Sequence, residues 1–135
     1  MEKNPTLLVV AAAVATGDGR VLLQQRPAGK AMAGLWEFPG GKVEAGERPE
    51  AALVRELEEE LGIAVAEEAL APAAFASAGL GERHLLLLLY LCRRWKGEPE
   101  ALDAAALQWA TPAEMRDLPM PPADVPLVEA LETLL

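Results

Sequence analysis

Residues 41–63 read GKVEAGERPEAALVRELEEELGI, and this stretch determines how the rest of the chain is interpreted. From Pro49 to Leu61 its apolar residues recur at helical spacing. Proline is favoured in the first turn of a helix and glycine commonly follows the last one, so Pro49 and Gly62 mark the expected boundaries. Four apolar residues fall on one face of this helix: Leu53, Val54, Leu57 and Leu61. The stretch therefore predicts an amphipathic helix packed on a core.

Three glutamates, Glu56, Glu59 and Glu60, lie beside this apolar face, whereas Glu58 points away from it. Like charges at this spacing repel by roughly 0.2–0.5 kcal/mol per pair in an isolated helix. Glu47 precedes the helix, and the intervening turn brings it towards the same cluster. Carboxylates are hard ligands that suit Mg²⁺ or Mn²⁺, so the cluster predicts a divalent cation that bridges to a phosphate. The alternative is an ordinary solvated acidic face.

Residues next to the glutamates are expected to support them. Arg55 is spaced to pair with Glu59 or with Glu47, and so to hold a metal ligand in its orientation. Gly40 and Gly41 permit positive φ angles and a close approach of the backbone, so that a carbonyl can turn towards a metal. An ordinary turn is the alternative interpretation of these two glycines.

Outside this stretch, strands and helices alternate irregularly. The predicted strands are Thr6 to Ala15, Val21 to Gln25, His84 to Cys92 and Leu107 to Ala110. The turn signal Gly17-Asp18-Gly19 predicts that the first two form a strand pair. A capping-box pattern at Thr111 to Glu114 starts a helix, and a last helix runs from about Pro126 to Leu135. We therefore expect one α/β domain over residues 1–135, with a mixed sheet covered by helices on both faces.

The composition excludes several classes of protein. The formal net charge of the 135 residues is −9, which argues against a surface that tracks the phosphates of duplex DNA or RNA. An acidic protein can still bind a polyanionic nucleotide through a divalent cation. Cys92 is the only cysteine, so no internal disulfide is possible. The apolar stretch from Leu7 to Ala15 is too short to cross a membrane, and no secretion leader can be drawn. We expect a cytoplasmic protein with no membrane partner.

The spacing of the central stretch resembles the Nudix box at every defined position. Gly41 is followed after five residues by Glu47, after seven more by Arg55-Glu56-Leu57, and then by Glu59-Glu60 and Gly62-Ile63. Residues 36–42, 94–99 and 121–124 extend the resemblance over nearly the whole chain. It is closest to MutT-type enzymes, which hydrolyse oxidised guanine nucleotides.

The resemblance implies an α/β/α sandwich that binds catalytic Mg²⁺, or Mn²⁺ in its place. Glu56, Glu59 and Glu60 would hold the cation together with the Gly40 carbonyl, and Glu47 would assist by metal or water contacts. In MutT-like enzymes water attacks the β-phosphorus of a nucleoside triphosphate and releases the monophosphate and pyrophosphate.

Further site residues are implied, each with a plainer alternative. Arg26 aligns with a phosphate-contacting arginine of the family, or is a surface charge after a strand. Lys42 is a candidate phosphate contact. Phe38 lines the base pocket or belongs to the core. Asp103 lies where MutT-like proteins carry an acidic residue that approaches the metals, or is a solvated loop carboxylate.

Asp124 departs from the bacterial MutT pattern, in which an asparagine contacts the base. An ionised aspartate only accepts hydrogen bonds, which suits a base with an exocyclic amine such as cytosine. A protonated Asp124 in a dry pocket would still serve an oxidised guanine. Alternatively, Asp124 caps the final helix.

Three functions remain open at this point. The first is hydrolysis of 8-oxo-dGTP, and the second is pyrophosphohydrolysis of another nucleotide such as CTP or dCTP, ADP-ribose or a dinucleotide. The third is an inactive nucleotide-binding module, which would be expected to lose glutamates of the box. The hydrophobic residues near the C-terminus allow either a monomer or a weak homodimer.

Overall fold

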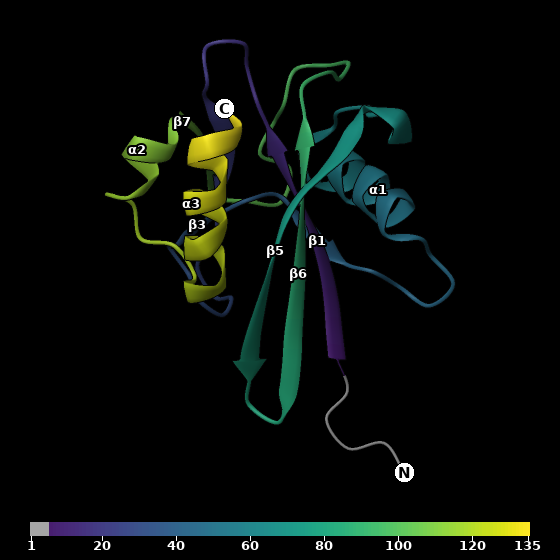
Figure 1. The fold of residues 1–135 in the computed structure, drawn as a ribbon, viewed down its shortest axis with the longest axis vertical. Helices are drawn as coiled ribbons and strands as arrows, with labels where there is room; N and C mark the ends of the chain where they lie inside the picture. Colours follow the sequence, from purple (N-terminus) through teal and green to yellow (C-terminus); the bar gives the residue numbers. More distant parts are fainter. Residues whose placement is uncertain (1–5) are drawn as a thin grey trace.

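The strands of the protein form two sheets (Figure 1), as seen in a computed structural model that describes residues 6–135. The first sheet has the order β4-β1-β6-β5, with the bounds Gly40–Lys42, Thr6–Val14, Arg83–Cys92 and Leu70–Leu80. The second has the order β3-β2-β7, with the bounds Trp36–Glu37, Val21–Gln25 and Ala106–Ala110. Strands β1 and β6 run parallel, whereas β4 and β5 pair antiparallel with their neighbours. The prediction of a mixed sheet is therefore confirmed.

Helices cover this first sheet from both sides, as predicted (Figure 1). The α-helices are α1 (Pro49–Leu61), α2 (Pro112–Met115) and α3 (Val125–Leu134), and the 3-10 helices are η1 (Glu67–Ala69) and η2 (Pro122–Asp124). The predicted capping box of α2 is present, with hydrogen bonds in both directions between Thr111 and Glu114. Within residues 6–135, no helix has the length and apolar character needed to cross a membrane.

Strand β1 separates two hydrophobic clusters because its successive side chains point to opposite faces of the sheet. Val10 and Val14 face the cluster that α1 completes with Leu53, Leu57 and Leu61. Ala11 and Ala13 face the cluster that α3 completes with Leu127 and Leu131. The small alanines on the second face allow α3 and the three-stranded sheet to approach closely. Helix α1 is thereby fixed against the sheet by its apolar face.

The predicted pairing of the first two strands was wrong. Only Ala15 and Val21 form a bridge between them, and β2 pairs instead with β3 and β7. Strand β1 pairs with β4 over Val9 to Ala11 on one edge and with β6 along its whole length on the other. The turn at residues 17–19 therefore carries the chain from one sheet to the other.

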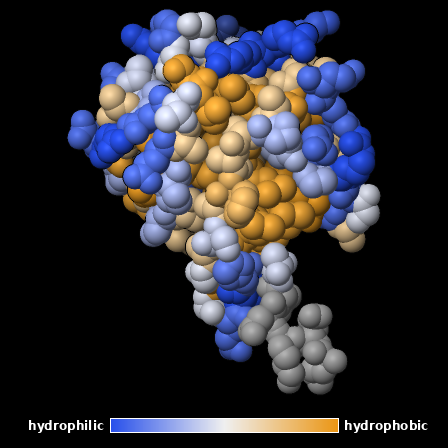
Figure 2. Space-filling view, in the orientation of Figure 1, coloured by the Kyte–Doolittle hydropathy of each residue, from blue (hydrophilic) through white to orange (hydrophobic). Residues whose placement is uncertain are grey.

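Strand β5 was not predicted, because its sequence LAPAAFASAGL is rich in alanine and contains a proline, both of which are uncommon in strands. It forms because β6 offers a long apolar partner across the turn at Gly81. A bulge between Pro72 and Ala74 interrupts the ladder. Figure 2 shows apolar surface over the strands between α1 and α3, and Phe75 of β5 is 66% exposed.

Candidate active site

The glutamates of the central stretch are presented by α1. The helix begins at Pro49 and ends at Gly62, which has a left-handed φ of 72° and donates its N–H to the Glu58 carbonyl at 3.0 Å. Both predicted boundaries are confirmed. Leu53, Leu57 and Leu61 are fully buried, and Glu58 is exposed. The buried face therefore leaves Glu56 and Glu60 next to Gly41 and Gly40 of β4, with which α1 is in contact.

Arg55 joins Glu47 to the helix. Its Nε and Nη2 donate to the two carboxylate oxygens of Glu47 at 2.8 and 2.9 Å. Its Nη1 lies 3.1 Å from Glu56 Oε2 and 3.4 Å from Glu59 Oε1. Both predicted partners of Arg55, Glu47 and Glu59, are thus found. The hydrogen bond from Arg55, together with the backbone N–H of Glu44, lowers the pKa of Glu47 to about 2.

Glu56 and Glu60 form the buried part of the site. The Glu56 side chain is 15% exposed and lies against the backbone of Gly41. A Cβ atom at position 41 would collide with the Glu56 carboxylate, so glycine leaves room for this side chain. Glu60 Oε1 accepts the N–H of Gly40 at 3.1 Å and Nε2 of Gln24 at 2.9 Å.

The pKa of Glu60 is raised to about 8, mainly because the carboxyl group is buried. The negative charge of the neighbouring Glu56 raises it further. A buried carboxylate beside a second one is costly unless a positive charge compensates it. The possible ligands are the hard carboxylate oxygens of Glu56 and Glu60. These two side chains lie beside the backbone of Gly40 and Gly41, where there is no room for a further side chain. These residues fit a divalent cation.

The carboxylates of the cluster do not all point to one position. In the described part of the chain, no three acidic, histidine or cysteine side chains already converge as a metal site would require. Glu47 and the largely exposed Glu59 are instead engaged by Arg55. The backbone N–H of Gly40 donates a hydrogen bond to Glu60. The metal contact expected for the Gly40 carbonyl stays a prediction.

A second cluster contains two predicted substrate residues, Arg26 and Asp124, with Glu37 between them. Arg26 Nη1 lies 3.2 and 3.3 Å from the Glu37 carboxylate oxygens, and Arg26 Nε donates to the Ala31 carbonyl at 2.6 Å. Burial raises the pKa of Glu37, and Arg26 partly offsets this. Burial raises the pKa of Asp124 to about 7, and the charge of Glu37 adds to the increase.

Asp124 does not cap α3 as the alternative interpretation proposed. Its backbone is helical at φ −81° and ψ −22°, and its side chain makes no capping hydrogen bond. The carboxyl group is instead buried and accepts the backbone N–H of Phe38. Phe38 itself is 4% exposed and belongs to the hydrophobic core, as its alternative interpretation stated. Contact of either residue with a nucleobase stays a prediction.

The two remaining predicted residues are peripheral. Lys42 is exposed at the end of β4, and its carbonyl accepts Arg55 Nη2 at 3.2 Å, whereas contact of its ammonium group with a phosphate stays a prediction. Asp103 is exposed, and its charge raises the pKa of Glu37. No contact between Asp103 and a glutamate of the box is found among the described residues. The structure thus groups Asp103 with the second cluster.

Two residues of these clusters were missed from the sequence, Gln24 and Glu37. Gln24 is a polar residue two positions after the buried Leu22 and therefore lies on the same face of β2. A polar residue on a buried strand face was the sequence signal that could have identified it. Glu37 lies opposite Gln24 in the register of β2 and β3. Together they connect the glutamates of α1 with the cluster around Asp124.

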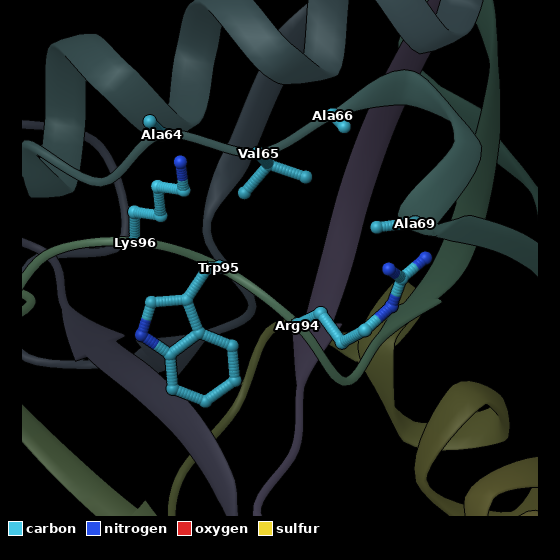
Figure 3. A pocket seen from close by; sticks show the side chains of 7 residues that line it. All are labelled: Ala64, Val65, Ala66, Ala69, Arg94, Trp95 and Lys96. Atoms are coloured by element: carbon cyan, nitrogen blue, oxygen red, sulfur yellow. The ribbon is translucent and has the colours of Figure 1, made fainter.

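The protein also has a cavity of about 430 Å³ that is separate from these clusters (Figure 3). It lies between residues 64–69, which follow α1, and residues 94–96, which follow β6. Alanine side chains, Val65 and Trp95 line it, with Arg94 and Lys96. None of the predicted site residues contributes to this cavity.

Comparison with known proteins agrees with this geometry. The family profile described as "NUDIX domain" matches residues 10–130. The CTP pyrophosphohydrolase of Escherichia coli is 43% identical over 129 residues, which cover 95% of this chain and 93% of that protein. The 8-oxo-dGTP diphosphatase of Escherichia coli is 35% identical over 117 residues, which cover 87% of this chain and 89% of that protein.

A solved structure has a closely similar fold over nearly the whole chain. The solution structure of the Escherichia coli ORF135 protein superposes with a TM-score of 0.86 at 41% identity, covering 97% of this chain and 91% of that one. The matched region includes both the box helix and the segment that contains Asp124. The expected fold is therefore confirmed, and the chain belongs to the Nudix family as a MutT-like Nudix hydrolase.

Proposed function

We propose that this hydrolase is a Mg²⁺-dependent pyrophosphohydrolase that converts a nucleoside triphosphate into the monophosphate and pyrophosphate. Its first candidate substrate is 8-oxo-dGTP. CTP or dCTP is the second, because the relative that matches over 129 residues is a CTP pyrophosphohydrolase and because Asp124 is acidic. The observation that supports both candidates is that Asp124 is buried and has a pKa of about 7. Such a group can be protonated or ionised near neutral pH, so it can suit either nucleobase.

The residues of α1 would carry the metal-dependent chemistry. Glu56, Glu59 and Glu60 would hold the cation, with Mn²⁺ able to replace Mg²⁺. A bound divalent cation neutralises phosphate charge and makes water a stronger nucleophile at neutral pH. Arg55 holds Glu47 in a fixed plane, and this carboxylate remains ionised throughout the neutral range because its pKa is about 2. Glu47 is thus suited to orient the attacking water.

The second cluster would recognise the substrate. Lys42, and Arg26 once it is released from Glu37, are the cations available for the phosphate chain. Asp124 would contact the nucleobase. When it is protonated it both donates and accepts, as an oxidised guanine requires, and when it is ionised it only accepts, as the cytosine amine requires. Its pKa of about 7 places the change within the neutral range.

Rates with 8-oxo-dGTP and dCTP, measured as pyrophosphate release between pH 6 and 8.5, test this proposal. The ratio of the two kcat/KM values cancels pH effects on the catalytic step that both substrates share. We expect the 8-oxo-dGTP preference to fall several-fold as the pH rises. In Asp124→Asn the ratio should be high and independent of pH. A wild-type ratio that does not change with pH would contradict the nucleobase role of Asp124, and no pyrophosphate from any nucleotide would contradict the reaction.

The enzyme is expected to act in the cytoplasm as a monomer or a weak homodimer. The side chains of Phe75 and Leu80 on β5 are exposed apolar groups that we propose for such a dimer contact. Sedimentation over a range of protein concentrations, with Phe75→Ser as the comparison, would separate the two states.

A further inference from the structure

Gln24 is one of two buried polar side chains in the described part of the chain, the other being Asp124. It lies in β2, the central strand of the three-stranded sheet, so its backbone is fixed by β3 on one edge and β7 on the other. Its side chain is 5% exposed and its Nε2 lies 2.9 Å from Glu60 Oε1. The contact therefore joins the second sheet to the glutamates of α1.

Both hydrogen-bond donors on Glu60 engage the same oxygen. Oε1 accepts the amide of Gln24 and, at 3.1 Å, the backbone N–H of Gly40. Two donors from two strands fix the plane of a carboxylate better than one does. Oε2 receives neither of these donors, and the Glu60 carboxyl group lies next to that of Glu56, so a cation would be shared by the two side chains.

The other end of the Gln24 amide is unsatisfied. Its Oε1 is buried and has no hydrogen-bond partner among the described residues. A buried amide oxygen without a partner destabilises the folded state, so an apolar side chain of similar shape would serve folding better at this position. Packing in the core therefore does not explain a glutamine at position 24. The hydrogen bond from its Nε2 to Glu60 does.

We propose that Gln24 is a positioning residue that holds Glu60 with Oε2 directed to the catalytic cation. The inference rests on the metal role proposed for Glu60. Gln24 touches neither the cation nor the substrate in this assignment. Its side chain also hydrogen-bonds Glu37, and it acts on the cation through Glu60. Its position opposite Glu37 also places it between the metal side and the nucleobase side of the site.

Gln24→Met tests this, because methionine is similar in shape and lacks both the donor and the unsatisfied oxygen. The readout is Mn²⁺ binding without nucleotide, followed by electron paramagnetic resonance. We expect Kd to rise about tenfold, as for other residues that orient metal ligands. The Mg²⁺ concentration for half-maximal activity should rise by the same factor, with kcat at saturating Mg²⁺ within about threefold. Tm should stay equal or increase.

Gln25→Met is the matched control. Gln25 is the next residue of the same strand, but its Nε2 donates to the Gly34 carbonyl at 3.1 Å, away from Glu60. Its Mn²⁺ affinity should equal that of the wild type. If Gln24→Met does not fold, Gln24→Asn, which keeps the amide but is one carbon too short to reach Glu60, should show the same loss of affinity.

The outcomes separate this inference from the proposal on which it rests. Weakened Mn²⁺ binding in Glu60→Gln with unchanged binding in Gln24→Met overturns the role of Gln24 alone. Unchanged binding in both variants overturns the metal role of Glu60. A lower Tm and a lower kcat with an unchanged metal Kd identify Gln24 as a core residue and also overturn the inference.

Discussion

Arg55 and Glu47 form a two-point ion pair, with Nε 2.8 Å from Oε2 and Nη2 2.9 Å from Oε1. Parallel hydrogen bonds of this kind fix the plane of a carboxylate as well as its position. The third nitrogen of the same guanidinium reaches Glu56 and Glu59. One planar side chain thus aligns a loop carboxylate with two helix carboxylates, which explains why an arginine lies inside an otherwise acidic sequence.

Replacing Arg55 by lysine should lower kcat/KM by about 10- to 100-fold, because an ammonium group cannot make the parallel contacts to Glu47. Pyrophosphate release at saturating Mg²⁺ measures the effect. Arg48→Lys is the comparison, since Arg48 is exposed and pairs with Glu67, outside the cluster. It should change the rate by less than about twofold. Equal rates for the two variants would show that the charge of residue 55 suffices.

Adjacent glutamates of α1 should differ sharply in their importance. We expect Glu59→Gln to reduce kcat by about 100-fold or more, because it removes a charged ligand where charge develops in the reaction. Glu58→Gln, one residue earlier and pointing to solvent, should remain within about twofold of the wild type. Steady-state rates with a single nucleotide at saturating Mg²⁺ make the comparison. A loss of similar size in both would mean that only the overall negative charge of the helix matters.

Gly41→Ala should weaken metal binding without a change in charge. The added Cβ would collide with the carboxyl group of Glu56, so that carboxylate must move. We expect the Mn²⁺ Kd, measured by calorimetry, to rise about tenfold. Gly17→Ala is the matched control, because a Cβ there meets nothing within 4 Å. Wild-type affinity in Gly41→Ala would show that Glu56 does not need its observed position.

The site could be predicted where it depends on local geometry. Fixed spacing along one helix places Glu56 and Glu60 in the buried part of the site and Glu59 within reach of Arg55, and the left-handed Gly62 ends the helix where the sequence predicts. Arg55 reaches its predicted partners for the same reason, because each lies on the helix or directly before it. Short-range rules suffice for these residues.

Features that depend on the pairing of distant strands could not be predicted in this way. Gln24 meets Glu60 across 36 residues of sequence, and only the second sheet brings them together. The turn after β1 gave a misleading signal, since it carries the chain between sheets rather than into a hairpin. Asp124 likewise has the sequence position of a helix cap, yet tertiary contacts bury its carboxyl group near Glu37. Local sequence patterns do not indicate which residues become neighbours when distant strands pair.

Asp124 should make the stability of the protein depend on pH. Burial raises its pKa from 3.8 to about 7, so the folded state binds the proton more tightly than the unfolded state does. Below about pH 3 both states are protonated and the group has no net effect. As the pH rises towards 7 the unfolded state ionises first, and the wild type is progressively destabilised relative to a neutral side chain. Above pH 7 the accumulated loss in the free energy of unfolding is of the order of 4 kcal/mol.

Asp124→Asn removes this ionisation while its amide oxygen can still accept the Phe38 N–H. We therefore expect the free energy of unfolding of Asp124→Asn, minus that of the wild type, to increase from pH 4 to pH 8 and then to level off. Urea unfolding at several pH values measures this difference, and contributions from groups that titrate equally in both proteins cancel. Asp117→Asn, at an exposed position, should give a flat difference. A flat profile for Asp124→Asn as well would mean that the carboxyl group is solvated in solution, and its role in choosing between nucleobases by protonation would then be lost.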